Sequence, residues 1–407
     1  MTPNCPLGGV RMSAPLDAAA GPRPELTVVL PCLNEARTLA ACIREATTAV
    51  RHGGIAAEIV VADNGSTDDS PAIAAREGAT VVAVAPRGYG NALRAGIAAA
   101  RGRFVVMGDA DASYDFGQIP LIVEKLRGGS DLVMGNRFRG GIADGAMPWK
   151  NRYLGNPFLS WIGRRLFRTP VGDFHCGLRG FSAEAYRRMD LRTTGMEFAT
   201  EMIIKASLLG LRIAEVPSVL RPDGRGRPPH LRPWRDGWRH LRFMLLFSPR
   251  WLFLYPGLVL MAAGLLAGAA LLPGPFRVGR VEFDINTLLF AAIAVLVGFQ
   301  AVAFSVLAKF FAIQAGLRSP DARFARWLRI VTLETGTIAG LILVAAGLGL
   351  SVFSVWLWRQ RGFGPLVPGQ MLRWVIPGAL SLTLGCQVIM TNFFLNMLRL
   401  DTRKDPQ

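Results

Sequence analysis

The chain has 407 residues, of which 51% are hydrophobic and 18% are charged, and its formal net charge is +17. A charge of this size is typical of proteins that bind nucleic acid or an anionic membrane, but the arginines cluster beside apolar segments and no nucleic-acid-binding motif accompanies them. The composition therefore favours a membrane surface and a phosphorylated substrate as partners and excludes nucleic acid.

Composition changes along the chain and predicts its organisation. The five cysteines show neither zinc spacing nor a disulfide framework, which predicts reduced thiols and a first domain that faces the cytosol. The predicted parts are a disordered N-terminal tail at 1–24, an α/β domain at 25–229, an amphipathic interface helix at 230–250, a transmembrane region of about four helices at 251–398 and a cytoplasmic tail at 399–407.

Strands and helices alternate in the first domain. The pattern predicts strands at 26–31, 58–62, 80–85 and 104–107, and helices at 36–50, 70–77, 90–100 and 117–126. Such alternation is typical of parallel strands joined by right-handed crossovers. We therefore expect an open α/β sheet whose strands end at a common edge.

Carboxylates follow three of these strands. Glu35 and Asp63 come after the first two, and Asp109 and Asp111 follow the buried strand at 104–107. Ligands bind beyond the carboxyl ends of strands in open α/β sheets, so the four side chains predict a nucleotide site. Asp109 and Asp111 also suit one hard cation, Mg²⁺ or Mn²⁺. The alternative is a polar loop in which Asp115 caps the next helix.

A turn with two glycines, Gly88 and Gly90, is a second feature that predicts a ligand site at this edge of the sheet. In the turn from Gly88 to Asn91, Gly90 allows the backbone to come close to a ligand at a helix N-terminus, where anions are favoured. The first strand-to-helix turn, Pro31 to Glu35, contains no glycine. The G-x-G-x-x-G fingerprint is therefore absent, which argues against a nicotinamide cofactor.

Seven short motifs occur in an order that is similar to a known family. They are Val28 to Glu35, Ala62 to Asp68, Gly88 to Ala92, Met107 to Asp111, Met134 to Phe138, Asp173 to Phe181 and Glu215 to Pro217. Over residues 25–250 the chain resembles the family 2 inverting glycosyltransferases with a GT-A fold, in their polyprenyl-phosphate branch. The resemblance implies a mixed, Rossmann-like sheet in the catalytic domain, followed by membrane helices.

The resemblance also implies roles for particular residues. The nucleotide would be held by Pro31, Asn34, Glu35, Asp63, Asn64, Gly90, Asn91 and Asp109. The metal would be held by Asp109 and Asp111, with Ser113 at the position where mannose synthases have a Gln. The acceptor phosphate would be held by Arg137, Arg152, Asn156, Arg221 and Arg225. Asp109, Asp111 and Arg137 would form the catalytic set. A planar guanidinium also suits phosphate on chemical grounds alone.

The segment 230–250 carries arginines and tryptophans on different helical faces, as a helix in the membrane interface does. Four apolar stretches follow, at 252–272, 288–307, 330–350 with an extension to 356, and 375–397. Each can span a core of ~30 Å. Basic residues in the loop 309–329 and in the tail predict that both are cytoplasmic, with the catalytic domain on the same side of the cell membrane.

Gln370 to Trp374 matches Q-x-x-R-W, a motif of processive polysaccharide synthases. The predicted topology puts it outside the cell, away from a cytoplasmic active site, so we interpret it as a chance match. A membrane scaffold without catalysis is the other alternative. The sequence thus predicts transfer of one hexose from a nucleotide sugar of the GDP-mannose or UDP-glucose type to a polyprenyl phosphate, for cell-envelope glycans or protein glycosylation, and leaves a homo-oligomer open.

Overall fold

A computed structural model describes residues 23–226, 233–314, 322–365 and 368–399. These residues form two compact units, one built from 23–149, 175–199 and 212–226, the other from 150–174, 200–211 and the described residues from 233 onward. Five parts of the predictions lie outside the described residues: the tail at 1–22, the end of the α/β domain with the start of the interface helix at 227–232, the loop centre at 315–321, residues 366–367 of the transmembrane region and the tail at 400–407.

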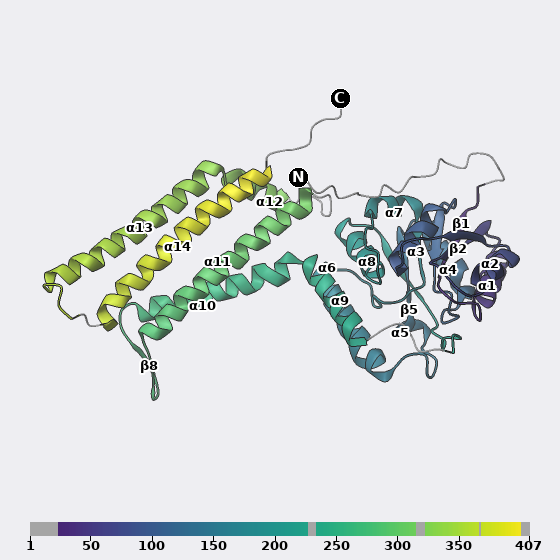
Figure 1. The fold of residues 1–407 in the computed structure, drawn as a ribbon, viewed down its shortest axis with the longest axis horizontal. Coiled ribbons are helices and arrows are strands. Elements are labelled where there is room, and N and C mark those ends of the chain that lie inside the picture. The colour runs from purple at the N-terminus through teal and green to yellow at the C-terminus, as the bar shows by residue number, and fades with distance from the viewer. Residues whose placement is uncertain (1–22, 227–232, 315–321, 366–367, 400–407) are drawn as a thin grey trace, which may run out of the picture. The chain divides into compact units, whose positions relative to one another are not determined.

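The first unit is built on a sheet that, within the described residues, has seven strands in the order β3-β2-β1-β4-β6-β5-β7. The strands are β1 (Leu26–Cys32), β2 (Ala57–Asp63), β3 (Thr80–Ala83), β4 (Phe104–Met107), β5 (Leu132–Asn136), β6 (Arg179–Ser182) and β7 (Ile213–Pro217). β6 runs antiparallel to β4 and β5, and the other pairs are parallel. This mixed sheet confirms the predicted fold class, and Figure 1 shows its helices on both sides.

Strand register explains why the carboxylates meet. Cys32 at the end of β1 pairs with Asp63 at the end of β2, and Val29 pairs with Met107 at the end of β4. The three parallel strands therefore end at one edge, and the residues that follow them, including Glu35 and Asp109, emerge there.

Helices cover both faces of the sheet because successive strand residues point to opposite sides. Val28, Leu30 and Val106 share a buried cluster with α1 (Leu39–His52) and α4 (Ile119–Arg127). On the other face α3 (Tyr89–Ala98) lies so close that a Cβ on Gly96 would come 2.6 Å from the Val29 side chain. The remaining helices of this unit are α2 (Ser70–Arg76), α5 (Arg137–Gly140) and α7 (Ala183–Met189).

The helix predicted at 117–126 starts with a 3-10 turn, Phe116–Gln118, before α4. Asp115 caps this turn, because its side chain accepts a hydrogen bond from Gly117 N at 3.0 Å. The cap leaves Asp109 and Asp111 free of this role, because it uses a different carboxylate.

The second unit begins with helices that pack together outside the apolar bundle. A π-helical turn, Asn151–Gly155, leads into α6 (Asn156–Phe167), which packs against α9 (Pro233–Leu246). α8 (Phe198–Leu208) is tied to α9 by Thr200 Oγ1 and His240 Nδ1, 2.8 Å apart. Phe158, Trp161 and Trp238 are each more than half exposed. α6 thus presents exposed aromatic rings as α9 does, and the spacing of Phe158 and Trp161, three residues apart, is a helical signal that the predictions did not include.

Four helices in the described residues are long and apolar enough to cross a membrane, which confirms the four predicted spans. They are Arg250–Leu271, Ile285–Gln314, Leu333–Gln360 and Pro368–Arg399. The first consists of a π-helical turn, Arg250–Leu254, and α10 (Tyr255–Leu271), and the others are α11, α13 and α14. A hairpin of β8 (Phe276–Val278) and β9 (Val281–Phe283) joins α10 to α11, and α12 (Ala322–Ile330) precedes α13.

Small residues bring the long helices together in pairs. α10 packs on α11 and α13 on α14, as Figure 1 shows. A Cβ on Gly264 of α10 would lie 2.5 Å from Ala291 O, and one on Gly385 of α14 would lie 2.7 Å from Gly340 O. Close backbone approach at glycines is typical of membrane helices, because lipid provides no hydrophobic force to hold them together.

The Q-x-x-R-W residues lie in the first turns of α14 and contact other helices of the bundle. Gln370 Oε1 accepts from Arg361 Nη2 at 2.9 Å, and Trp374 meets the Phe353 ring edge-on at 5.0 Å. Arg373 pairs with Asp284 and donates to Leu271 O at the end of α10. These contacts give the motif a structural role within the bundle.

Candidate functional site

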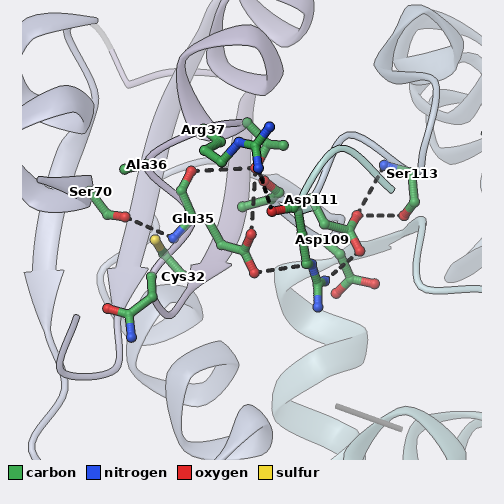
Figure 2. A network of polar contacts seen from close by, with 12 residues as sticks. Cys32, Glu35, Ala36, Arg37, Ser70, Asp109, Asp111 and Ser113 are labelled. Atoms are coloured by element: carbon green, nitrogen blue, oxygen red, sulfur yellow. Dashed lines mark hydrogen bonds and ion pairs between the residues drawn. The ribbon is translucent and has the colours of Figure 1, made fainter. Parts of the chain in front are cut away.

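Three carboxylates gather at the carboxyl edge of the first unit's sheet. Glu35 follows β1, and Asp109 and Asp111 follow β4; Figure 2 shows their side chains turned towards the same space. Glu35 and Asp111 are both 7% exposed. Buried carboxylates require a partner or a cation, so the contacts of each decide what this cluster can bind.

Asp111 is held at both oxygens. Its Oδ1 accepts from Ser113 N at 3.0 Å and from Ser113 Oγ at 2.5 Å, and its Oδ2 pairs with Arg225. Arg225 also reaches Glu35, with Nε 3.2 Å from Oε1. Ser113 therefore orients Asp111 through hydrogen bonds, and one guanidinium contacts two carboxylates.

Asp109 is oriented by a tyrosine. Its Oδ1 accepts from the Tyr89 hydroxyl at 2.9 Å, and a Cβ on Gly177 would come 2.7 Å from its Oδ2. Burial and the Asp111 charge raise the pKa of Asp109 to about 6, while the Tyr89 hydrogen bond acts in the opposite direction. Close to neutral pH the side chain is therefore mostly ionised, but with little margin.

The predicted nucleotide residues form one connected framework. Asp63 accepts from Ser66 N at 3.2 Å, and Asn34, at φ 58°, accepts from Thr67 N at 2.7 Å. Asn64 accepts from Gly88 N at 2.6 Å, which ties the end of β2 to the glycine turn. Pro31 lies on β1 beside Ala62 of β2.

The glycine turn packs closely against a distant loop. A Cβ on Gly90 would lie 2.5 Å from Thr193 O, and Asn91 N donates to Thr194 O at 3.3 Å. This packing fixes the start of α3 and so aims Tyr89 at Asp109. Gly90 therefore has a packing reason in addition to its predicted contact with the nucleotide.

The predicted acceptor residues fall into both units. Arg137 is buried at the start of α5, and Arg221 pairs with Glu45 at 3.1 Å and with Asp115 at 3.0 Å. Arg152 and Asn156 belong to the second unit, four residues apart at the start of α6. Arg225 lies on the predicted metal and nucleotide carboxylates, so its predicted phosphate contact would require it to move.

The carboxylates fit a divalent cation that takes some of its ligands from the protein and the others from a nucleotide. Within the described residues, no group of three or more His, Cys, Asp and Glu side chains is arranged around a metal position. Mg²⁺ usually takes one or two carboxylates and completes its shell with water and substrate phosphates. Asp109 and Asp111 would provide these carboxylates, and Ser113 would hold Asp111 in place.

Sequence reasoning missed the residues that support the site from other segments. Tyr89 and Gly177 were inside the quoted motifs without a role, and Thr38 was not singled out, although its hydroxyl donates to Ala110 O at 2.7 Å. Arg179 is fully buried and donates to Cys176 O at 2.8 Å. Arg179 is the first residue of β6, and a charged residue at a strand position is the signal in the sequence that could have indicated a buried cation.

Two family models match the chain. Residues 27–190 match glycosyl transferase family 2, and residues 306–399 match the glycosyltransferase family 2 C-terminal transmembrane region. The low-salt glycan biosynthesis hexosyltransferase Agl6 of Haloferax volcanii is 35% identical over 388 residues, covering 94% of this chain and 91% of the relative. The dolichyl-phosphate hexose transferase of the same organism is 33% identical over 162 residues, covering 40% of this chain and 68% of the relative.

Among solved structures, the glucosyl-3-phosphoglycerate synthase from Mycobacterium tuberculosis in complex with Mn²⁺ and UDP-glucose is similar to the chain. The two are 26% identical with a TM-score of 0.43, and the match covers 55% of this chain and 78% of the synthase.

Proposed function

The chain belongs to glycosyltransferase family 2, and from this premise we propose that it transfers one hexose from a nucleotide sugar to a polyprenyl phosphate. The observation that carries the proposal is the presence, in one chain, of a carboxylate cluster at the edge of an α/β sheet and four membrane-spanning helices. The cluster suits a nucleotide diphosphate with a cation, and the helices give access to a lipid acceptor.

The donor belongs on the carboxylate edge. Glu35, Asp63 and Asn64 would contact the nucleoside, and the glycine turn would approach the nucleotide through its backbone. A cation on Asp109 and Asp111 would supply positive charge for the diphosphate leaving group. The donor would be of the GDP-mannose or UDP-glucose type.

The acceptor phosphate would act as the nucleophile. Its oxygen attacks the anomeric carbon as the bond from that carbon to the donor diphosphate breaks, which inverts the anomeric centre. A phosphomonoester has a second pKa near ~6, so the acceptor is mostly dianionic at neutral pH and needs little help from a general base. Arg137, Arg152, Asn156 and Arg221 would orient it, which makes positioning the main contribution of the protein.

Exposed aromatic side chains support a lipid acceptor. Phe158 and Trp161 on α6 and Trp238 on α9 belong to packed helices of one unit, and aromatic rings of this kind favour the membrane interface. Arg152 and Asn156 stand at the start of α6, where they would meet a phosphate at head-group level. The basic residues of α12, Arg326 and Arg329 among them, favour a cytoplasmic site at the inner membrane.

A panel of nucleotide sugars tests the proposal. The purified full-length chain is incubated with each donor, polyprenyl phosphate and Mg²⁺ or Mn²⁺, and organic extracts are analysed for lipid-linked sugar. One donor is expected to label the lipid in a reaction that requires the acceptor phosphate. Labelled polymer would favour a processive synthase, and no product with any donor would favour a scaffold that lacks catalysis.

A further inference from the structure

Arg225 contacts two of the three carboxylates at this edge of the sheet. Its side chain is 15% exposed and spans two carboxylates, with Nε 3.2 Å from Glu35 Oε1 and an ion pair to Asp111 Oδ2. Glu35 follows β1 and Asp111 follows β4, so a single guanidinium links the ends of two neighbouring strands. Buried carboxylates this close together would repel one another without it.

The segment that carries Arg225 is attached to the metal loop by its backbone. Gly224 N donates to Asp111 O at 3.0 Å, and Arg221 N donates to Ser113 O at 2.8 Å. Leu220 forms an antiparallel bridge with Tyr114. These backbone hydrogen bonds hold the segment so that the Arg225 guanidinium lies beside Asp111. A surface arginine that contacts a carboxylate only through its side chain has no such support.

A guanidinium and a divalent cation compete for Asp111. Oδ1 already accepts two hydrogen bonds from Ser113, and Oδ2 faces Arg225. A cation bound directly to a carboxylate lies at ~2.0–2.1 Å for Mg²⁺, and a second positive charge against the same oxygen is repelled. Direct binding of the cation to Asp111 Oδ2 would therefore displace Arg225 from that oxygen.

We propose that Arg225 is a stand-in cation, which offsets part of the negative charge of Glu35 and Asp111 before the metal binds and contacts the donor diphosphate afterwards. This inference rests on the proposed function, in which Asp111 holds the metal. It moves Arg225 from the acceptor side, where the sequence put it, to the donor side. In this exchange a positive group faces the Asp111 carboxylate at each stage, so that carboxylate is never buried without a partner.

The proposal predicts that removal of Arg225 strengthens metal binding. In the full-length protein without nucleotide, Arg225→Ala is expected to bind Mn²⁺ about tenfold more tightly than the wild type, because no charge-assisted contact must first be broken. Electron paramagnetic resonance of free Mn²⁺ measures this directly. Arg225→Lys keeps the positive charge but loses the planar guanidinium that can contact two carboxylates, so its Mn²⁺ affinity is expected to lie between those of the wild type and Arg225→Ala.

Arg221→Ala provides the matched control. Arg221 lies on the same segment and pairs with Glu45 and Asp115, not with Asp111, so its removal is expected to leave Mn²⁺ affinity unchanged. Circular dichroism establishes that each variant is folded. An Arg225→Ala protein that is folded and binds Mn²⁺ no more tightly than the wild type would overturn the proposal, as would an equal gain in Arg221→Ala.

A second measurement tests where Arg225 goes. With Mn²⁺ saturating, Arg225→Ala is expected to bind a nucleoside diphosphate about tenfold more weakly, because a phosphate contact is lost. Unchanged affinity would contradict the donor-side position. The outcome is separable from that of the proposed function: tighter Mn²⁺ binding without any lipid-linked product would support the stand-in role and reject the lipid acceptor.

Discussion

At the scale of single residues, the site depends on how Asp109 and Asp111 keep their charges. Asp109 has a pKa raised to about 6 by burial and by the charge of Asp111. Asp111 has Arg225 and Ser113 as partners. The two neighbouring carboxylates are thus supported differently, and each gives its own prediction.

For Asp109 we predict that acid weakens metal binding. A carboxylate must lose its proton to bind a metal, so Mn²⁺ affinity without nucleotide should fall as the pH drops through about 6. Tyr89→Phe removes a hydrogen bond that lowers the pKa of Asp109, so the midpoint should move to higher pH. A Mn²⁺ titration series from pH 5 to pH 8, in ~0.5 unit steps, measures both midpoints.

Folding stability gives the same test without metal. The folded protein holds the Asp109 proton more tightly than the unfolded chain, whose Asp pKa is near ~3.9, so this residue lowers the free energy of unfolding as the pH rises from about 4 to about 6. Tyr153→Phe, at an exposed tyrosine of the second unit, is the control for Tyr89→Phe and should leave the pH dependence unchanged. A Mn²⁺ affinity that stays constant from pH 5 to pH 8 would show that the pKa of Asp109 is not raised.

For Asp111 we predict that Asp111→Asn reduces turnover by about 10²–10³, because the change removes charge at the metal site and preserves shape. Ser113 can still donate to the amide oxygen, so the protein should remain folded. Initial rates and circular dichroism measure the two effects. Asp69→Asn is the control: it changes an exposed carboxylate before α2 and should have the turnover of the wild type. Full activity of Asp111→Asn would show that Asp111 does not belong to the site.

Which residues could be read from the sequence follows from their separation along the chain. Asp109 and Asp111 were predictable because a buried strand ends directly in them. Arg225 lies 114 positions from its partner Asp111, and nothing local indicates that the two meet. Tyr89 stands between two glycines whose purpose was evident, but its direction is set by packing against the Thr193 and Thr194 backbone.

At the level of helices and strands, the sequence predicted which elements exist better than it predicted the residues at which they begin and end. The strand Phe104–Met107 was predicted to the residue because polar residues bound it. The helix predicted at 36–50 begins instead at Leu39. α14 starts at Pro368, well before the predicted 375, and the polar and charged residues of its first turns pair with Arg361, just after α13, and with Asp284, just before α11. Hydropathy alone could not reveal those partners.

For the membrane bundle we predict that Gly264→Ala destabilises the protein by about 1–3 kcal/mol, because the added Cβ would lie 2.5 Å from Ala291 O on α11. Gly268→Ala on the same helix provides the control, since a Cβ there meets nothing within 4 Å. Thermal unfolding in detergent compares the two. Equal melting temperatures would mean that α10 and α11 do not approach as described.

In the whole molecule, we expect the nucleotide site and the Q-x-x-R-W residues to lie on opposite sides of the membrane. Four spans return the chain to its starting side, and α14 begins on the far side if the first unit is cytoplasmic. Chain growth by a processive synthase would need the motif beside the acceptor.

Topology is therefore the next prediction. A cysteine introduced at Gly369, before the motif, should react with a membrane-impermeant reagent from outside intact cells, after the exposed Cys386 has been replaced by Ser. Trp374→Ala should keep its transfer rate while losing stability, because Trp374 contacts Phe353 within the bundle. Labelling only after the cells are opened would reverse the orientation.

Transfer of one hexose with inversion is tested by the mass and the anomeric configuration of the lipid product. The full-length chain is given its accepted nucleotide sugar and a polyprenyl phosphate of defined length, and the extracted lipid is analysed by mass spectrometry and NMR. We predict one hexose per lipid phosphate, with the anomeric configuration opposite to that of the donor. A lipid that carries several sugars, a retained configuration or transfer that does not require the lipid phosphate would contradict the account.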